Sequence, residues 1–258
     1  MIAFDMSLRN SFLLTTSLVL FGLLTTSTPA IAEGAAESSA TKMPVVAELF
    51  TSQSCSSCPA AERLFNDLAD QEGVIAIQWH VDYWDNLVHG RAGKWKDPFS
   101  SAANTQRQRN YNYALRGTGS VYTPQAVIGG IMETTGSRAR GVTRMINAAP
   151  PADAYVQIEK GHQGYNIKVS PLNETSDINA EAMVVTLLSE SATDIRGGEN
   201  KGLSVKGRNI AVDTEMLGEW SGKEKTYQAA QMSEGYSCAV IVQDRDKGKI
   251  LGASYCPN

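Results

Sequence analysis

The fold is decided by one stretch of the chain, VVAELFTSQSCSSCPAAERLF, at residues 45–65. It begins with a nearly continuous apolar run, which is typical of a central strand covered on both faces. A polar loop follows, and from Pro59 apolar residues recur at helical spacing up to Leu68, which predicts an amphipathic helix. Cys55 and Cys58 therefore stand where a strand gives way to a helix.

The position of these two thiols predicts redox chemistry. Unpaired amides and the helix dipole at a helix N-terminus stabilise a thiolate, so we expect Cys55 to be an exposed nucleophile. Cys58 would then be the resolving thiol that releases a mixed disulfide. An inert structural disulfide and a zinc site are alternatives. Zinc needs about four ligands, whereas the chain has no second Cys-x-x-Cys and only 3 histidines. We expect no metal and no cofactor.

The pattern around this stretch predicts an α/β fold class. Up to the pair Pro150 and Pro151, strand and helix patterns alternate, with helices expected from Pro59 and over 102–116 and strands over 74–81, 125–128 and 131–134. Beyond this pair, short apolar runs separated by polar turns are typical of a small all-β sandwich. We therefore predict one domain at residues 44–150 and a β-sandwich domain at 151–258.

The other two cysteines are predicted to form a structural disulfide. The runs 236–243 and 249–256 flank a polar stretch that reads as a hairpin turn. Folding this hairpin about Lys247 sets Cys238 opposite Cys256, at a separation that a disulfide spans. Cys55 and Cys58 are then left for each other.

The first residues of the chain predict export. Arg9, the apolar run 12–24 and the sequence Ala30-Ile31-Ala32 are typical of a signal peptide at residues 1–32. A membrane anchor is the alternative, but the run is shorter than the about 20 residues that cross a bilayer. Residues 33–43 are expected to be a flexible N-terminus. A periplasmic or secreted location would permit disulfides, and we expect no stable membrane insertion after cleavage.

The charge pattern argues against nucleic acid as a partner. The net charge is -4, and the basic residues are scattered rather than gathered on one stretch. We expect protein or small-molecule thiols and disulfides as partners instead.

The order of elements, the Cys-x-x-Cys that opens the first helix, and Thr123-Pro124 before the third strand resemble a thioredoxin fold. This resemblance implies a thioredoxin-like domain in which Pro124 is cis and faces the dithiol. Thr123 and Pro124 would shape the groove for a partner, because a proline has no amide to donate and leaves the neighbouring backbone free to pair with a peptide.

Longer motifs are similar to the secreted bacterial family catalogued as domain of unknown function 1223. They are residues 48–59, 80–85, 95–99, 107–109, 121–125, 196–200 and 218–220. The resemblance covers most of the chain after the signal peptide and implies a thioredoxin-like domain followed by an all-β domain. Cys238 and Cys256 are not part of this pattern.

Several neighbours of the dithiol have two interpretations. Glu48 lies on the strand that leads to Cys55, where it would relay protons to the resolving thiol or face an edge as an ordinary carboxylate. His80 and Asp82 share a strand face, either near the dithiol or on a solvated rim.

The aromatic and basic residues beyond this strand are also open to interpretation. Tyr83 and Trp84 lie in an irregular stretch, where they would form a rim that receives a substrate peptide or pack in the core. Arg107 and Arg109 are two apart on a helix, which favours solvated charges over a paired site.

The sequence thus predicts a periplasmic thiol-disulfide oxidoreductase that uses Cys55 and Cys58. The direction of exchange is open, because the Ser-Ser spacer carries neither charge nor ring. Two other hypotheses are a non-catalytic binding or adaptor module on the same scaffold and a redox sensor that oxidises without turnover.

Overall fold

The computed structural model describes residues 43–173 and 178–257, all within one compact unit that spans Ala40–Asn258. The predicted signal peptide and all of the predicted flexible N-terminus except Met43 lie outside the described residues. Among the helices of the described part, none has both the length and the apolar character that crossing a bilayer requires.

The helices and strands follow the alternation expected before Pro150 and are all strands in the described residues after it. In chain order they are β1 Val45–Thr51, α1 Pro59–Leu68, β2 Val74–His80, the short 3₁₀ helix η1 Gly90–Ala92, α2 Ala102–Arg116, β3 Gln125–Ile128, β4 Met132–Thr135, α3 Ala139–Ala148, β5 Ala154–Lys160, β6 Tyr165–Pro171, β7 Ala180–Asp194, β8 Ser204–Trp220, β9 Lys225–Ala229, β10 Tyr236–Asp244 and β11 Ile250–Tyr255.

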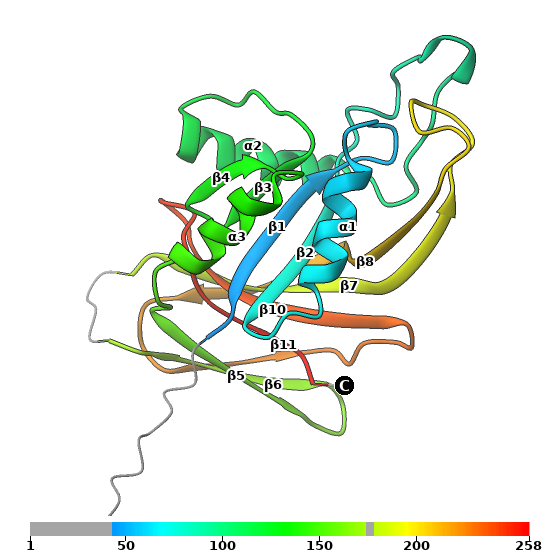
Figure 1. The fold of residues 1–258 in the computed structure, drawn as a ribbon. Helices are drawn as coiled ribbons and strands as arrows, with labels where there is room; N and C mark the ends of the chain where they lie inside the picture. The colour runs from blue at the N-terminus through cyan, green and yellow to red at the C-terminus, as the bar shows by residue number, and fades with distance from the viewer. Residues whose placement is uncertain (1–42, 174–177, 258) are drawn as a thin grey trace, which may run out of the picture. The chain divides into compact units, whose positions relative to one another are not determined.

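A mixed sheet of eight strands forms the centre of the unit, in the order β11-β10-β7-β8-β2-β1-β3-β4 (Figure 1). β1 pairs with β2 in parallel and with β3 antiparallel. Four strands from beyond Pro150 continue this sheet, which β8 joins beside β2 through the pair Gln78 and Ile210. The chain is therefore α/β with a large mixed sheet, while the division into domains at residue 150 stays a prediction.

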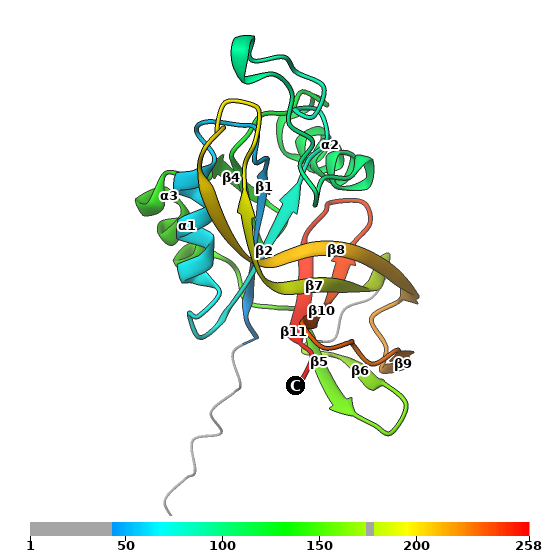
Figure 2. The same ribbon diagram turned by 90° about the vertical axis from the view of Figure 1, so that its right-hand side faces the viewer.

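The helices cover both faces of the strands that lead to the dithiol (Figure 2). On one face, α1 and α3 pack through Phe65, Val142 and Ile146 against Ala47 and Leu49 of β1. On the other face, α2 packs through Tyr111 against a core that includes Phe50 and Trp79. Apolar side chains on both faces explain why the sequence of β1 is a continuous apolar run.

A second, three-stranded sheet of β5, β6 and β9 covers part of the large sheet. Its Val156, Ile167 and Val169 pack against Ala182 of β7 and Val240 of β10 in one buried cluster. This packing of sheet on sheet agrees with the all-β character expected after Pro151.

The expectation of short strands after Pro151 is wrong for β7 and β8. They contain 15 and 17 residues and pair along most of their length. Their alternation is hidden in the sequence because the register shifts twice, at Ala182/Met183 and at Thr186/Leu187. The middle of β8 is also mostly exposed. This long hairpin carries its loop to the end of β1.

Candidate functional site

Cys55 and Cys58 lie in the turn between β1 and α1, and both carry free thiols. The amide of Cys58 donates to the carbonyl of Cys55 at 3.1 Å, which closes the turn. Cys58 is the N-cap residue of α1, and its own carbonyl accepts from the amides of Ala61 and Glu62. The sequence thus placed the pair correctly at the start of the helix.

The expectation that Cys55 is exposed is wrong. Its relative exposure is 1%, and that of Cys58 is 0%. Residues 196–200, within the loop between β7 and β8, contact the turn that holds Cys55, and we call this segment the cover loop. In both views this loop lies beside the β1–α1 turn (Figures 1 and 2). The motif at residues 196–200 is recognisable in the sequence. Because it lies more than 130 residues after Cys58, nothing in the sequence indicated that it contacts the dithiol.

Side-chain hydrogen bonds hold the cover loop on the turn. Asn200 Nδ2 donates to the carbonyl oxygens of Gln53 at 2.9 Å and Cys55 at 2.8 Å. Glu199 Oε2 accepts from the amide of Ser56 at 2.8 Å. A carboxylate is favourable at a helix N-terminus. Here the Glu199 carboxylate binds the amide of Ser56, the residue next to Cys55.

Two positions of the cover loop pack so closely against neighbouring residues that only glycine fits. A Cβ atom at Gly197 would lie 2.1 Å from the carbonyl oxygen of Lys94, and one at Gly198 would lie 2.8 Å from Ser54 Oγ. Gly198 also has a φ of +70°, which favours glycine. The cover loop therefore fits only because these positions lack side chains.

The two thiols differ in acidity in opposite directions. The hydrogen bond from Cys58 is the largest cause that lowers the pKa of Cys55 to about 6, with help from Ser57 and Thr123 and against the effect of burial. Burial raises the pKa of Cys58 well above its usual value, and Cys55 and Glu62 raise it further. At neutral pH Cys55 is then the thiolate and Cys58 the thiol.

Thr123 and Trp84, two of the predicted substrate-binding residues, lie beside the dithiol. Thr123 presents its carbonyl oxygen 3.9 Å from Cys55 Sγ, and its hydroxyl accepts from Trp84 Nε1 at 2.8 Å. The Thr123–Pro124 peptide bond is cis, as the resemblance implied. Tyr83 is half-buried, and its hydroxyl donates to Gln108 Oε1 at 3.4 Å.

Glu48 does not lie with the dithiol. Its Oε1 accepts from Arg107 Nε at 2.6 Å, and its Oε2 accepts from the hydroxyl of Tyr111. Alternation along β1 turns Glu48 toward α2, whereas Thr51 is turned toward α1. The expectation that Arg107 is a solvated charge is wrong, because its side chain is 16% exposed and pairs with the buried Glu48.

The sequence reasoning missed the carboxylate that does lie beside Cys58, which is Glu62. It stands one helical turn after Cys58 and is 2% exposed. Its Oε1 accepts from Thr51 Oγ1 at 2.7 Å. Burial raises the pKa of Glu62, against the lowering effect of His80. The four-residue spacing from Cys58 was the available signal.

His80 is buried near Glu62, away from any solvated rim. Its Nδ1 lies 2.7 Å from Asp97 Oδ2, and both side chains are almost fully buried. Burial acts to lower the pKa of His80, but Asp97 outweighs it and the pKa is raised. Asp82 lies apart from this pair and accepts from Thr105 Oγ1 at 2.6 Å.

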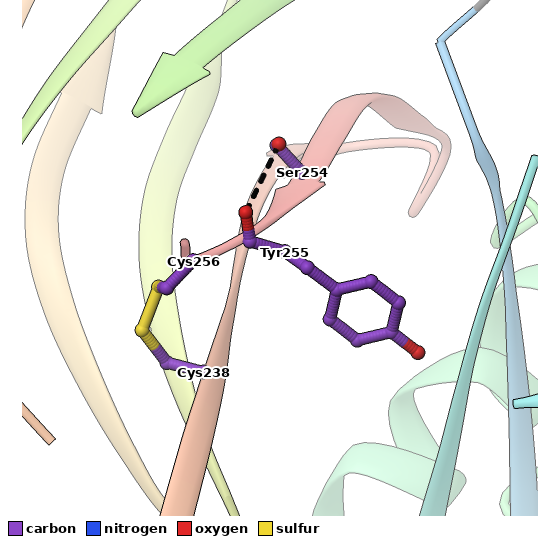
Figure 3. The surroundings of a disulfide bond; sticks show 4 residues. All are labelled: Cys238, Ser254, Tyr255 and Cys256. Carbon is purple, nitrogen blue, oxygen red and sulfur yellow. Dashed lines mark hydrogen bonds between the residues drawn. A yellow bond between two sulfur atoms is a disulfide. The ribbon is translucent and has the colours of Figure 1, made fainter. Parts of the chain in front are cut away.

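Cys238 and Cys256 form the predicted disulfide across the β10–β11 hairpin, with Cα atoms 5.2 Å apart (Figure 3). The amide of Cys256 donates to the carbonyl of Cys238 at 2.8 Å. The side chain of Tyr255 extends away from the disulfide, and its hydroxyl accepts from the amide of Ala76 at 3.1 Å. The disulfide thus lies at a distance from the dithiol, next to the core of the second sheet.

The open surface next to the dithiol is a shallow polar cleft of about 640 Å³. It is lined by Ser56, His89, Arg91, Ala92, Gly198, Glu199 and Lys201. Within residues 43–173 and 178–257, no cluster of three or more His, Cys, Asp or Glu side chains is arranged to hold a metal ion.

Comparison with known proteins gives a family and several similar solved structures. The model of the family described as "Protein of unknown function (DUF1223)" matches residues 46–243. A crystal structure of a protein from Agrobacterium tumefaciens is 27% identical, with a TM-score of 0.70, and the match covers 83% of this chain and 94% of that one. No curated protein matches the chain significantly.

A more distant likeness concerns the fold alone. The structure described as HBP35 of Porphyromonas gingivalis is 10% identical, with a TM-score of 0.53, and the match covers 83% of this chain and 74% of that one. The arrangement of strands and helices is therefore shared more widely than the sequence is.

Proposed function

This chain belongs to the DUF1223 family, whose description names no reaction, and we propose from the site itself that it catalyses thiol-disulfide exchange with Cys55 and Cys58. The partners would be protein or small-molecule thiols and disulfides. The observation that carries the proposal is the placement of two adjacent free thiols at the start of α1, with the carbonyl oxygen of Thr123 3.9 Å from Cys55 Sγ. The pKa of Cys55 is lowered to about 6, and that of Cys58 is raised.

The reaction uses each thiol in its favoured protonation state. The Cys55 thiolate attacks a substrate disulfide, a bond forms between Cys55 Sγ and one substrate sulfur, and the other substrate sulfur leaves as a thiolate. Cys58 then loses its proton and attacks Cys55 Sγ, so that the Cys55–Cys58 disulfide forms and the second substrate thiolate leaves. The substrate is reduced by two electrons and the dithiol is oxidised. The reverse sequence oxidises a substrate dithiol.

The cover loop must move before a protein substrate reaches Cys55. The loop is held by hydrogen bonds that Asn200 donates and Glu199 accepts, and by close backbone packing at its two glycines. Such bonds contribute about 0.5–1.5 kcal/mol each, so the loop can open at a modest cost in free energy. Opening would expose Cys55 together with the carbonyl of Thr123 that lies 3.9 Å from it.

The scaffold that we propose is a thioredoxin-like arrangement extended by a β-sandwich. It is supported by the order β1, α1, β2, α2, β3, β4, α3, by the helices on both faces of β1, and by the dithiol at the start of α1. A periplasmic or secreted location is supported by the disulfide between Cys238 and Cys256, because such bonds persist outside the reducing cytosol.

Trapping of a mixed disulfide tests the exchange. We expect the Cys58→Ala variant to stall with substrate bound to Cys55, because no second thiol releases it. The wild type should reduce insulin in the presence of dithiothreitol, and the Cys55→Ser variant should not. Turnover by Cys55→Ser equal to that of the wild type would refute the role of this thiol.

The burial of both sulfur atoms favours redox sensing as a second candidate function. A small oxidant such as hydrogen peroxide can reach a thiolate that is inaccessible to a protein substrate. It oxidises Cys55 to a sulfenic acid, and Cys58 then reacts with this sulfenic acid to form a disulfide and water. Peroxide should then form the Cys55–Cys58 disulfide rapidly in a protein that shows no insulin turnover. Slow oxidation, at the rate of an unperturbed thiol, would exclude this function.

A further inference from the structure

Two buried polar atoms near Cys58 are left without partners. Glu62 Oε2 and His80 Nε2 are both inaccessible to solvent, and neither has a hydrogen-bond partner among the described residues. A buried polar group without a partner lowers the stability of a fold by about 1–3 kcal/mol. Two such atoms on neighbouring side chains therefore require a physical explanation, such as a functional role.

The sheet register brings these two residues together. Thr51 of β1 and His80 of β2 are paired in the parallel ladder, so their side chains leave the sheet on the same face. Thr51 Oγ1 donates to Glu62 Oε1 at 2.7 Å, which places the Glu62 carboxyl over this pair. The charges of Glu62 and His80 each affect the ionisation of the other, which agrees with this proximity.

The far side of His80 is held by an ionised carboxylate. Asp97 Oδ2 lies 2.7 Å from His80 Nδ1 and accepts from the amide of Gln53 at 2.8 Å, and Asp97 Oδ1 accepts from the amide of Phe99 at 3.0 Å. These contacts fix the imidazole so that Nδ1 faces Asp97 and Nε2 is free. The other charged group whose field reaches His80 is Asp85.

We propose that Glu62, His80 and Asp97 form a buried proton store that takes the proton from Cys58 when this thiol attacks the mixed disulfide. The proposal rests on the exchange function proposed above and adds to it the positioning residues behind the resolving thiol. Cys58 and Glu62 are one helical turn apart, and the two unpartnered atoms are the positions between which a proton passes from Glu62 to His80.

In the resolving step one proton moves to the store while one disulfide bond replaces another. Cys58 gives its proton to Glu62, Glu62 gives a proton to His80 Nε2, and the resulting imidazolium is neutralised by Asp97. The Cys58 thiolate attacks Cys55 Sγ, the Cys55–Cys58 bond forms, and the substrate sulfur leaves with the bonding electron pair. In the reverse direction the store returns the proton to Cys58 as this sulfur becomes the leaving group. The store therefore carries one additional proton from the moment that Cys58 is deprotonated until this proton returns to Cys58 or passes to solvent.

The release of thionitrobenzoate (TNB) after reaction with Ellman's reagent isolates this step. The first TNB leaves when Cys55 is modified, and the second leaves when Cys58 attacks the Cys55 mixed disulfide. We expect Glu62→Gln and His80→Gln to slow the second release at about pH 7 by roughly 10- to 100-fold, as loss of a general base does. The difference should shrink toward about pH 10, where hydroxide removes the proton. The matched control His162→Gln, in the β5–β6 turn, should release at the wild-type rate.

A second measurement on the wild-type protein does not depend on the folding of variants. The ¹⁵N resonances of the His80 ring are compared between the dithiol and disulfide forms. We expect the pH midpoint of His80 to differ between the two forms and that of His162 to stay the same. Equal second-release rates in all variants, or an identical His80 midpoint in both forms, would overturn the proton store. If the wild type releases no second TNB, the proposed exchange function is refuted. The pH midpoint of His80 in the two forms then still tests the proton store.

Discussion

Asn200 Nδ2 donates a hydrogen bond of 2.8 Å to the carbonyl oxygen of Cys55, although 145 residues separate the two in the sequence. The same amide group also donates to the carbonyl of Gln53. One side chain from the second half of the chain thus closes the turn that holds the dithiol. We expect access to Cys55 to depend on whether these bonds are made.

Removal of the Asn200 side chain should open the cover loop. Two hydrogen bonds of about 1 kcal/mol each are lost in Asn200→Ala, so the open state should be populated about 10-fold or more above the wild type. The measurement is the rate of Cys55 alkylation by iodoacetamide at about pH 7. Asn147→Ala, an exposed change on α3, is the matched control and should leave the rate unchanged.

A side chain at Gly197 should have the same effect through a clash. Its Cβ atom would lie 2.1 Å from the carbonyl oxygen of Lys94, so Gly197→Ala must displace the loop. We expect faster alkylation of Cys55 and a lower melting temperature. Gly141→Ala on α3 has room for a methyl group, with its nearest contact at 3.5 Å, and serves as the comparison. Slower alkylation in Gly197→Ala would show that this loop does not control access.

The alkylation rate should follow the ionisation of Cys55. Because the pKa of Cys55 is lowered to about 6, the thiolate is present above this pH and the rate should fall as the pH drops through it. In Cys58→Ala the midpoint should move to higher pH, since the main hydrogen-bond donor is lost. Cys58→Ser keeps a donor, and its midpoint should stay nearer that of the wild type. A wild-type midpoint near that of a free cysteine would contradict the assignment.

The ion pair between Glu48 and Arg107 should stabilise the fold without serving the dithiol. Arg107→Ala leaves the Glu48 carboxylate buried without its cation, which should lower the free energy of unfolding by about 3–5 kcal/mol. Arg109→Ala on the same helix should cost about 1 kcal/mol or less. Chemical denaturation measures both, and the midpoint of Cys55 alkylation against pH should not move in either variant.

The disulfide should contribute to stability and leave the reactivity of Cys55 alone. It closes a loop with a sequence separation of 18 residues, for which the chain-entropy model gives about 3 kcal/mol. The double variant Cys238→Ala/Cys256→Ala should therefore unfold at lower denaturant concentration. Its iodoacetamide rate at Cys55 should equal that of the wild type. Equal stability of the two proteins would contradict a structural role.

Much of the fold before Pro150 was predictable because its signals are local. The helix over 102–116, the strands of the first half and the dithiol at the start of α1 follow from periodicity and from the loop between β1 and α1. The same holds for the pairing of Cys238 with Cys256, which needs only a hairpin. Glu48 shows the limit of this reasoning, because a one-residue difference in alternation turns it toward α2 and away from Cys58.

The sequence by itself determined the position of the two thiols, because the strand, the polar turn and the helix N-terminus around them are encoded by consecutive residues. Only the tertiary structure decided that Cys55 is covered, that Glu62 is the acid beside Cys58, and that His80 and Asp97 lie behind Glu62. These contacts join β1, α1, β2 and the β7–β8 loop, and no periodicity within one segment specifies how distant segments meet. They arise from the register of the ladder and from the long hairpin that continues the sheet.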